Sequence, residues 1–138
     1  MQKNFIHEVI EIGIPGMSVL DVGAGILKAT LEFRAKGYDV TALDIKIPPC
    51  IPEGIKFIET DFMKWEPDKE YDILFMQNSA QFIPKQQLLK KISLMKPKII
   101  AVATFYGNPT PDFPGKYAMT FYESKDFEFF GYIKQLLK

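Results

Sequence analysis

The chain has 138 residues, 47% hydrophobic and 25% charged, which predicts a single soluble globular domain spanning residues 1–138. Its 17 basic and 17 acidic side chains cancel, so no global field attracts nucleic acid or a membrane surface. No apolar run reaches the ~18 residues of a membrane span, and the first residues lack the apolar core of a signal peptide. With one cysteine, Cys50, which excludes an internal disulfide, these features predict a cytoplasmic protein.

The first part of the chain predicts a helix, a strand, a glycine turn and a second helix. Apolar residues recur at helical spacing over residues 5–12, and residues 19–22 form a short apolar run typical of a buried strand. Gly23 and Gly25 follow this run and let backbone N–H groups approach a ligand closely. From Ile26 the spacing becomes helical. One face of this helix is expected to carry Ile26, Leu27, Thr30, Leu31 and Arg34, with Lys28, Ala29 and Glu32 elsewhere. Such a succession forms the first half of a nucleotide-binding βαβ unit.

The second predicted strand covers residues 38–43 and ends at Asp44 and Ile45. Asp44 lies 19 residues after Gly25. An acid at that place accepts hydrogen bonds from both hydroxyls of a ribose. A dinucleotide fingerprint also needs a third glycine, three residues after the second, and that position holds Lys28. Two classes of cofactor fit this geometry, and the missing glycine makes the nicotinamide dinucleotides the less favoured class. A nicotinamide-dependent oxidoreductase is therefore the less favoured function.

Strands and helices continue to alternate along the rest of the chain. We expect strands at residues 55–59, 71–76 and 99–105, a helix at 84–95, a strand-like segment at 117–122 and a last helix from Ser124 to Leu137. Prolines and glycines predict loops at residues 46–54 and 107–116. The alternation predicts an α/β fold with a Rossmann-like, doubly wound and mostly parallel sheet of order 3-2-1-4-5. A ligand then binds at the carboxyl ends, near the switch between strands one and four.

Four segments resemble, in order, the motifs of the class I S-adenosylmethionine-dependent methyltransferases. They are residues 19–25 (Val-Leu-Asp-Val-Gly-Ala-Gly), 57–62 (Phe-Ile-Glu-Thr-Asp-Phe), 71–83 and 94–100. Many members carry another glycine where this chain has Leu27. The resemblance implies S-adenosylmethionine as cofactor and transfer of its methyl group, by in-line displacement, to an acceptor that the sequence does not identify.

The resemblance also implies roles for individual residues. The methionine part of the cofactor would lie near Asp21, Gly23, Ala24 and Gly25, although Asp21 is also placed to cap the glycine turn. The ribose would contact Asp44 and Ile45, and the adenine Asp61 and Phe62. Gln77 would contact the cofactor or the substrate, and the acceptor pocket would involve Asn78, Ser79, Phe105 and Tyr106. No metal ligand is implied.

The position of the chain end, Lys138, shapes the remaining expectations. Family members commonly add two strands after the last predicted helix, one of them antiparallel. We therefore expect a small, apparently truncated member that lacks these strands. The fifth strand would then be an open sheet edge, unless residues 117–122 pair with it, and an open edge favours a homodimer. The same shortness leaves open a second function, a non-catalytic or partner-dependent accessory subunit that binds the cofactor without turnover.

Overall fold

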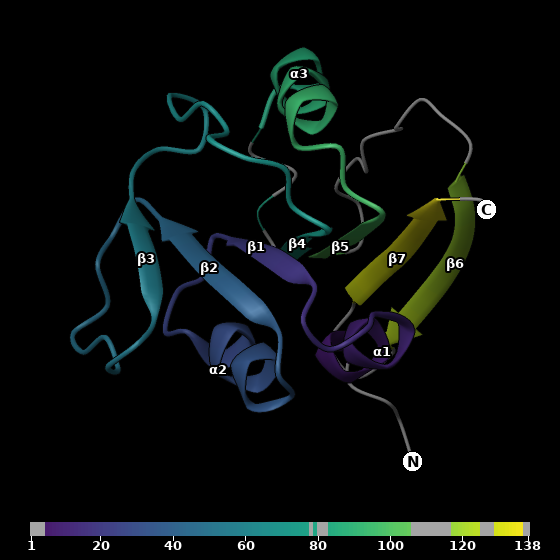
Figure 1. Ribbon diagram of the computed structural model, residues 1–138. Coiled ribbons are helices and arrows are strands. Elements are labelled where there is room, and N and C mark those ends of the chain that lie inside the picture. Colours follow the sequence, from purple (N-terminus) through teal and green to yellow (C-terminus); the bar gives the residue numbers. More distant parts are fainter. Residues whose placement is uncertain (1–4, 78, 80–82, 106–116, 125–128, 137–138) are drawn as a thin grey trace.

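A computed structural model describes residues 5–77, 79, 83–105, 117–124 and 129–136, which form one sheet between two layers of helices (Figure 1). Within this described part the sheet has seven strands in the order β3-β2-β1-β4-β5-β7-β6. The strands are β1 (Ser18–Val22), β2 (Asp39–Asp44), β3 (Lys56–Glu59), β4 (Ile73–Gln77), β5 (Ile99–Phe105), β6 (Tyr117–Ser124) and β7 (Phe129–Leu136). The helices are α1 (Phe5–Ile12), α2 (Lys28–Ala35) and α3 (Lys85–Met95).

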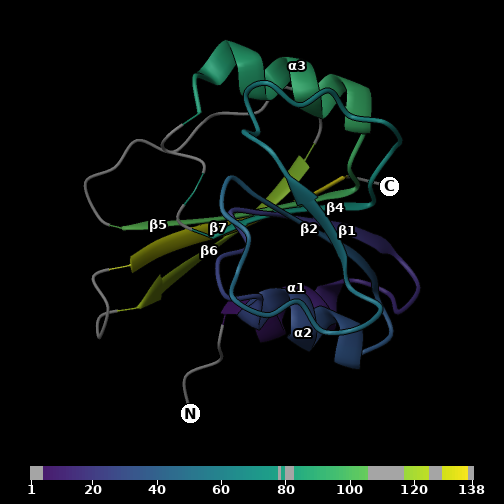
Figure 2. The same cartoon turned by 90° about the vertical axis from the view of Figure 1, so that its left-hand side faces the viewer.

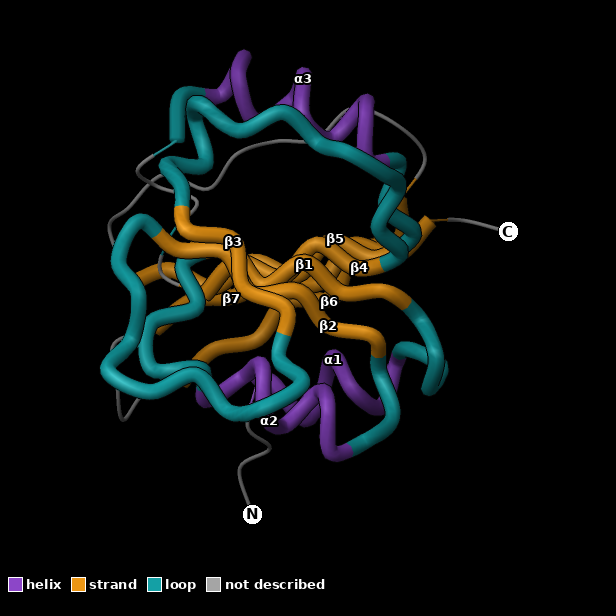
Figure 3. The backbone as a smooth tube through the Cα atoms, turned by 60° about the vertical axis from the view of Figure 1, so that its left-hand side comes forward, coloured by secondary structure: helices purple, strands orange, loops and turns teal. Residues whose placement is uncertain are grey.

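The helices cover both faces of the sheet, α1 and α2 on one face and α3 on the other (Figures 2 and 3). Successive residues of β1 alternate between these faces, as side chains of a strand must. Leu20 and Val22 pack in the core beneath α3, whereas Val19 packs with Phe33 of α2 in the core on the opposite face. Because both faces are buried, the strands read as continuous apolar runs, which is why the sequence pattern identified them.

The predicted order 3-2-1-4-5 of the first five strands is confirmed. β1 pairs in parallel with both β2 and β4, β2 with β3, and β4 with β5. The connection from β3 to β4 therefore carries the chain from one half of the sheet to the other, and the strand order reverses between β1 and β4. At such a switch point the loops after the two strands diverge and leave a crevice outside their carboxyl ends.

The last predicted helix is wrong, because residues 129–136 form β7 and Ser124 is the last residue of β6. β7 lies between β5 and β6 and is antiparallel to both. Its sequence holds Phe129, Phe130, Tyr132 and Ile133, all residue types that favour strands, and Gly131, which disfavours a helix interior. Pairing with β5 satisfies backbone groups that a helix would leave open along that strand.

The expectation of missing terminal strands is therefore also wrong. Both strands after β5 are present, one of them inserted antiparallel beside it. β5 is paired on both sides, by β4 and β7, so it is not the open edge from which we expected a homodimer. The outer strand of this half is β6. The argument that shortness favours an accessory subunit loses its basis for the same reason.

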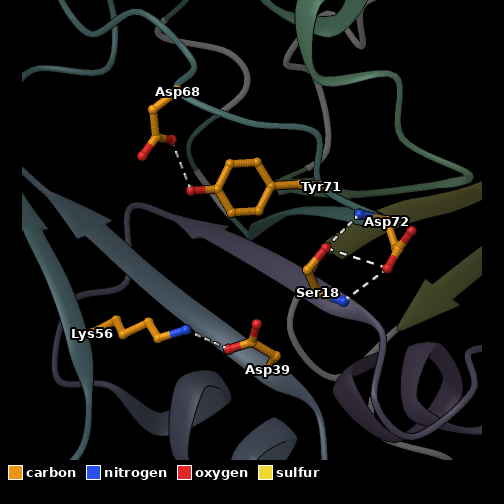
Figure 4. Close-up of polar contacts among 6 residues, drawn as sticks. All are labelled: Ser18, Asp39, Lys56, Asp68, Tyr71 and Asp72. Atoms are coloured by element: carbon orange, nitrogen blue, oxygen red, sulfur yellow. Dashed lines mark hydrogen bonds and ion pairs between the residues drawn. The ribbon is translucent and has the colours of Figure 1, made fainter.

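Polar contacts at the amino ends of the strands fix the end of the sheet opposite to the crevice (Figure 4). The backbone N–H of Ser18 donates to Asp72 Oδ2 at 2.9 Å, and the backbone N–H of Asp72 donates to Ser18 Oγ at 2.9 Å. Lys56 Nζ lies 2.8 Å from Asp39 Oδ1 and joins β3 to β2. Asp72 thus serves to join β1 to β4, at the far end from the strand termini where ligands bind.

The turn between β1 and α2 uses left-handed backbone at every second residue. Gly23 has φ 75°, Gly25 φ 57° and Leu27 φ 70°. This conformation costs a non-glycine residue about 1–2 kcal/mol. Leu27 adopts it at the start of α2, and its side chain is only 1% exposed. Burial of that side chain offsets the strain, so the turn forms although the chain lacks the family's additional glycine there.

We expect Leu27→Gly to be more stable than Leu27→Ala by about 0.5–1 kcal/mol. Both variants lose the same buried side chain, which costs about 2–5 kcal/mol, but only glycine relieves the left-handed strain. The measurement is the free energy of unfolding in urea. Leu88 is the control, since it is fully buried within α3 and there alanine should be the more stable replacement by about 1 kcal/mol. The same preference for alanine at Leu27 would contradict the strain argument.

Candidate functional site

Asp44 joins the carboxyl end of β2 to the glycine turn. Its Oδ2 accepts a hydrogen bond from the Gly25 N–H at 2.8 Å, and its Oδ1 accepts one from the Lys46 N–H at 3.3 Å. The backbone carbonyl of Leu43 accepts from the N–H of Gly23 at 2.8 Å, and from that of Ala24 at 3.2 Å. An ionised carboxylate has about four lone-pair sites, so two remain on Asp44 for a ligand.

Asp21 lies beneath the same turn and is 2% exposed. Its Oδ2 accepts a hydrogen bond from Thr30 Oγ1 of α2 at 2.7 Å, and no capping bond to the turn joins it among the described contacts. Burial raises the pKa of Asp21 to about 6; the Thr30 hydrogen bond opposes this shift, and the charge of Asp44 adds to it. Two carboxylates thus converge on the glycine turn, and a positively charged ligand would relieve the cost of burying one of them.

Ser79 brings the loop after β4 against this turn. The Ser79 hydroxyl donates to the Val22 carbonyl at 3.0 Å, and a Cβ added at Gly23 would lie 3.0 Å from the Cβ of Ser79. Gln77 is half-buried at the end of β4. Of the other predicted acceptor residues, Asn78 and Tyr106 lie outside the described residues, and only the backbone of Phe105 is described, as the last residue of β5.

Asp61 and Phe62 follow β3, and the N–H of Thr60 donates to the Asp44 carbonyl at 3.0 Å. Asp61 Oδ1 accepts from the Met63 N–H at 3.0 Å, while its Oδ2 accepts no hydrogen bond within the described part of the chain. The Phe62 side chain is 6% exposed and packs in the core beneath α3. The group of Phe62 that can reach a ligand is therefore its backbone N–H, which no described hydrogen bond uses.

Sequence reasoning missed several residues of this region. Thr30 was expected on one face of the helix but not as the partner of Asp21, because that bond depends on how α2 is rotated. Ile26 and Leu31 were expected on the apolar face of α2, but they are 81% and 39% exposed, and the buried residues are Ala29, Thr30 and Phe33. Exposed apolar side chains instead follow the carboxyl ends of β2 and β3, Ile45 at 63% and Met63 at 42%. Ile45 was predicted to contact the ribose, whereas Met63 was not predicted. A large apolar residue directly after the predicted adenine contacts is the signal that could have found Met63.

A metal site and a membrane-crossing helix are both absent from the described residues. No three histidine, cysteine, aspartate or glutamate side chains gather there in a way that could hold a metal ion. None of the described helices is long and apolar enough to cross a membrane.

No protein-family model and no curated protein sequence matches the chain. Solved structures do match its fold, at low sequence identity. A 1,6-didemethyltoxoflavin-N1-methyltransferase from Burkholderia thailandensis, solved with that substrate and S-adenosylhomocysteine, is 14% identical with a TM-score of 0.70, over 99% of this chain and 80% of that one. A TehB-like SAM-dependent methyltransferase from Corynebacterium glutamicum is 13% identical with a TM-score of 0.71, over 96% of this chain and 87% of that one.

A putative methyltransferase, yhhF, from Escherichia coli gives a TM-score of 0.72 at 11% identity, over 99% of this chain and 87% of that one. Each similarity covers nearly all of this chain and includes the strands after β5. At such low sequence identity the similarity is evidence for the fold alone. Together with the strand order and the glycine turn, it shows that this chain has the Rossmann-like fold of the class I S-adenosylmethionine-dependent methyltransferases.

Proposed function

We propose that the chain binds S-adenosylmethionine at the carboxyl ends of β1, β2 and β3 and transfers its methyl group to an acceptor. The observation that carries this proposal is the carboxylate of Asp44, which is held against the Gly25 N–H with two lone-pair sites to spare. A ribose offers two adjacent hydroxyl donors. Asp44 can accept from both without giving up the hydrogen bonds that hold it.

The methionine part of the cofactor fits the glycine turn. S-adenosylmethionine carries positive charge on its sulfonium and its amino group. Burial is the main cause of the raised pKa of Asp21, and the charge of Asp44 is a smaller one, so a cation bound beside this turn would offset both. No neighbouring atom lies within 4 Å of a Cβ built at Gly25, so a ligand can approach the backbone of that residue.

The adenine fits between the ends of β2 and β3. Its exocyclic amino group is a hydrogen-bond donor, which suits the free Oδ2 of Asp61, and its ring nitrogens are acceptors, which suit the backbone N–H of Phe62. Ile45 and Met63 are exposed apolar side chains that follow β2 and β3, and against the base they would lose contact with water.

Methyl transfer asks little acid–base chemistry of the protein. When bound, the cofactor supplies a methyl group activated on a sulfonium, which a lone pair of the acceptor displaces in line. The protein's own residues then have to orient the two partners and exclude water. Gln77 ends β4 and is followed in the chain by Asn78 and Ser79, where the acceptor would face the methyl group. Phe105 ends the adjacent strand β5 and is followed in the chain by Tyr106.

Calorimetric titration with S-adenosylhomocysteine tests the proposal, with NAD as the control ligand. We expect micromolar binding of S-adenosylhomocysteine alone. Binding of NAD instead would favour an oxidoreductase, and binding of neither would contradict the cofactor assignment.

Asp44→Ala should weaken S-adenosylhomocysteine binding in this titration by about 1–3 kcal/mol, the range for a lost charge-assisted hydrogen bond. Asp39→Ala is the matched control, because Asp39 lies at the other end of the same strand. The control should bind normally. Unchanged affinity in a folded Asp44→Ala variant would refute the ribose assignment.

Gly25→Ala should reduce the affinity for S-adenosylhomocysteine by at least about tenfold while the protein stays folded. The added Cβ meets no protein atom within 4 Å, so it would occupy space that the ligand needs. Gly16→Ala is the control: Gly16 also has positive φ, 97°, and no neighbour within 4 Å, but it precedes β1. The two variants should lose comparable stability. Equal ligand affinity in both would place the ligand elsewhere.

Asp21→Asn should remove a pH-dependent cost to stability. The folded pKa, about 6, lies above the ordinary 3.8, so Asp21 stabilises the fold below about pH 4 and this contribution is lost as the pH rises through 6. We expect the variant to gain about 2–3 kcal/mol over the wild type between pH 4 and pH 7.5, measured by urea unfolding.

Asp39→Asn is the control for this pH comparison. The hydrogen bond from Lys56 holds the pKa of Asp39 below its usual value of 3.8, so the stability that Asp39 contributes is already present above about pH 4 and is lost only as the pH falls below it. The difference in stability between Asp39→Asn and the wild type should therefore stay nearly constant between about pH 5 and pH 7.5, where that of Asp21→Asn changes. A difference between Asp21→Asn and the wild type that stays constant with pH would show that Asp21 titrates normally.

A further inference from the structure

Lys91 is a buried lysine on α3, only 4% exposed, whereas the adjacent Lys90 faces solvent. The helix packs on the sheet through Leu88, Ile92 and Met95. Lys91 is thus drawn into the edge of an apolar interface. A methionine there would bury the same stem without a charge.

The contacts of Lys91 all come from the segment that follows β3. Its Nζ donates to the backbone carbonyl of Trp65 and lies 5.4 Å from the centroid of the Phe62 ring. No carboxylate lies within ion-pair distance of Lys91 among the described residues. Burying an ammonium costs several kcal/mol unless its partners compensate. A single carbonyl and one aromatic face are few partners for stability alone, so these contacts point to another purpose.

The segment that Lys91 contacts is one helical turn. The N–H groups of Lys64 and Trp65 donate to the Asp61 carbonyl at 2.9 and 3.1 Å, and Asp61 Oδ1 accepts from the Met63 N–H at the beginning of the turn. The Trp65 carbonyl stands at the end, where a cation is favourable. The Phe62 ring stacks on the Trp65 ring at 5.9 Å between centroids. Lys91 therefore bonds the end of the turn and also contacts the ring of Phe62.

We propose that Lys91 is a positioning residue for base recognition: it holds the turn 61–65 so that the Asp61 carboxylate and the Phe62 N–H meet the edge of an adenine. This inference rests on the proposed function, which places the adenine there. Lys91 does not touch the ligand. It keeps the turn in the binding-competent conformation, and affinity falls in proportion to the fraction of time the turn spends outside it.

The test compares S-adenosylhomocysteine with S-inosylhomocysteine, in which a carbonyl oxygen replaces the exocyclic amino group. Facing an acceptor, that oxygen repels the Asp61 carboxylate, so the wild type should prefer the adenine ligand strongly. We expect Lys91→Met to bind S-adenosylhomocysteine about tenfold more weakly. S-inosylhomocysteine gains nothing from the Asp61 carboxylate in the held conformation, so its affinity should change little and the preference should shrink by about the same factor. Lys91→Arg keeps a cationic donor and should keep the preference, and Lys90→Met is the matched surface control.

A merely structural role for Lys91 would change stability and leave the ratio of the two affinities intact. We expect the melting temperature of Lys91→Met to stay near that of the wild type, because an apolar side chain replaces a buried charge. Should that variant not fold, Lys91→Gln permits the same comparison of ratios. An unchanged ratio in a folded variant that binds would overturn the inference alone. No binding of S-adenosylhomocysteine by the wild type would overturn the proposed function, and the inference with it.

Discussion

The hydrogen bond from the Gly25 N–H to the Asp44 carboxylate joins the two parts of the chain on which the site depends. The glycine turn belongs to the β1–α2 connection, and Asp44 ends the neighbouring strand. The left-handed residues 23, 25 and 27 curl the turn so that its N–H groups point at β2. A carboxylate is the acceptor that best satisfies such a donor while it retains capacity for a ligand. A neutral side chain could close the turn, but it would leave less for a ribose.

Two ionisable side chains, Asp21 and Lys91, are buried on opposite sides of the sheet. Asp21 is held close to Asp44, and burial and repulsion together raise its pKa toward neutrality. At the opposite side of the sheet, Lys91 is a buried cation without a described carboxylate partner. Neither group is placed where it most stabilises the empty fold. Strain of this kind is retained where a ligand or a ligand-binding segment supplies the missing compensation.

Local patterns predicted much of this molecule, and tertiary contacts decided the remainder. The apolar run of residues 19–22, the glycines after it and Asp44 follow from short-range rules, and all lie where the sequence placed them. The same rules predicted the wrong element for residues 129–136, because a short apolar run fits either a helix or a strand. Which of the two forms depends on pairing with the edge of β5 that β4 leaves unpaired. Phe62 is itself a predicted adenine contact, but its side chain belongs to the core. The bond between Thr30 and Asp21 depends on the rotation of a helix, which periodicity locates only coarsely.

Two described residues between Gln77 and Met95, Ser79 and Lys91, contact the parts of the chain that the proposed function assigns to the cofactor. Near the start of this segment, Ser79 bonds the Val22 carbonyl beside the glycine turn. Near its end, Lys91 bonds the Trp65 carbonyl of the turn proposed to read the adenine. The intervening chain is where an acceptor would face the methyl group. An acceptor that shifts this segment would therefore act on the two ends of the cofactor together, so that binding of either ligand affects the affinity for the other by the same factor.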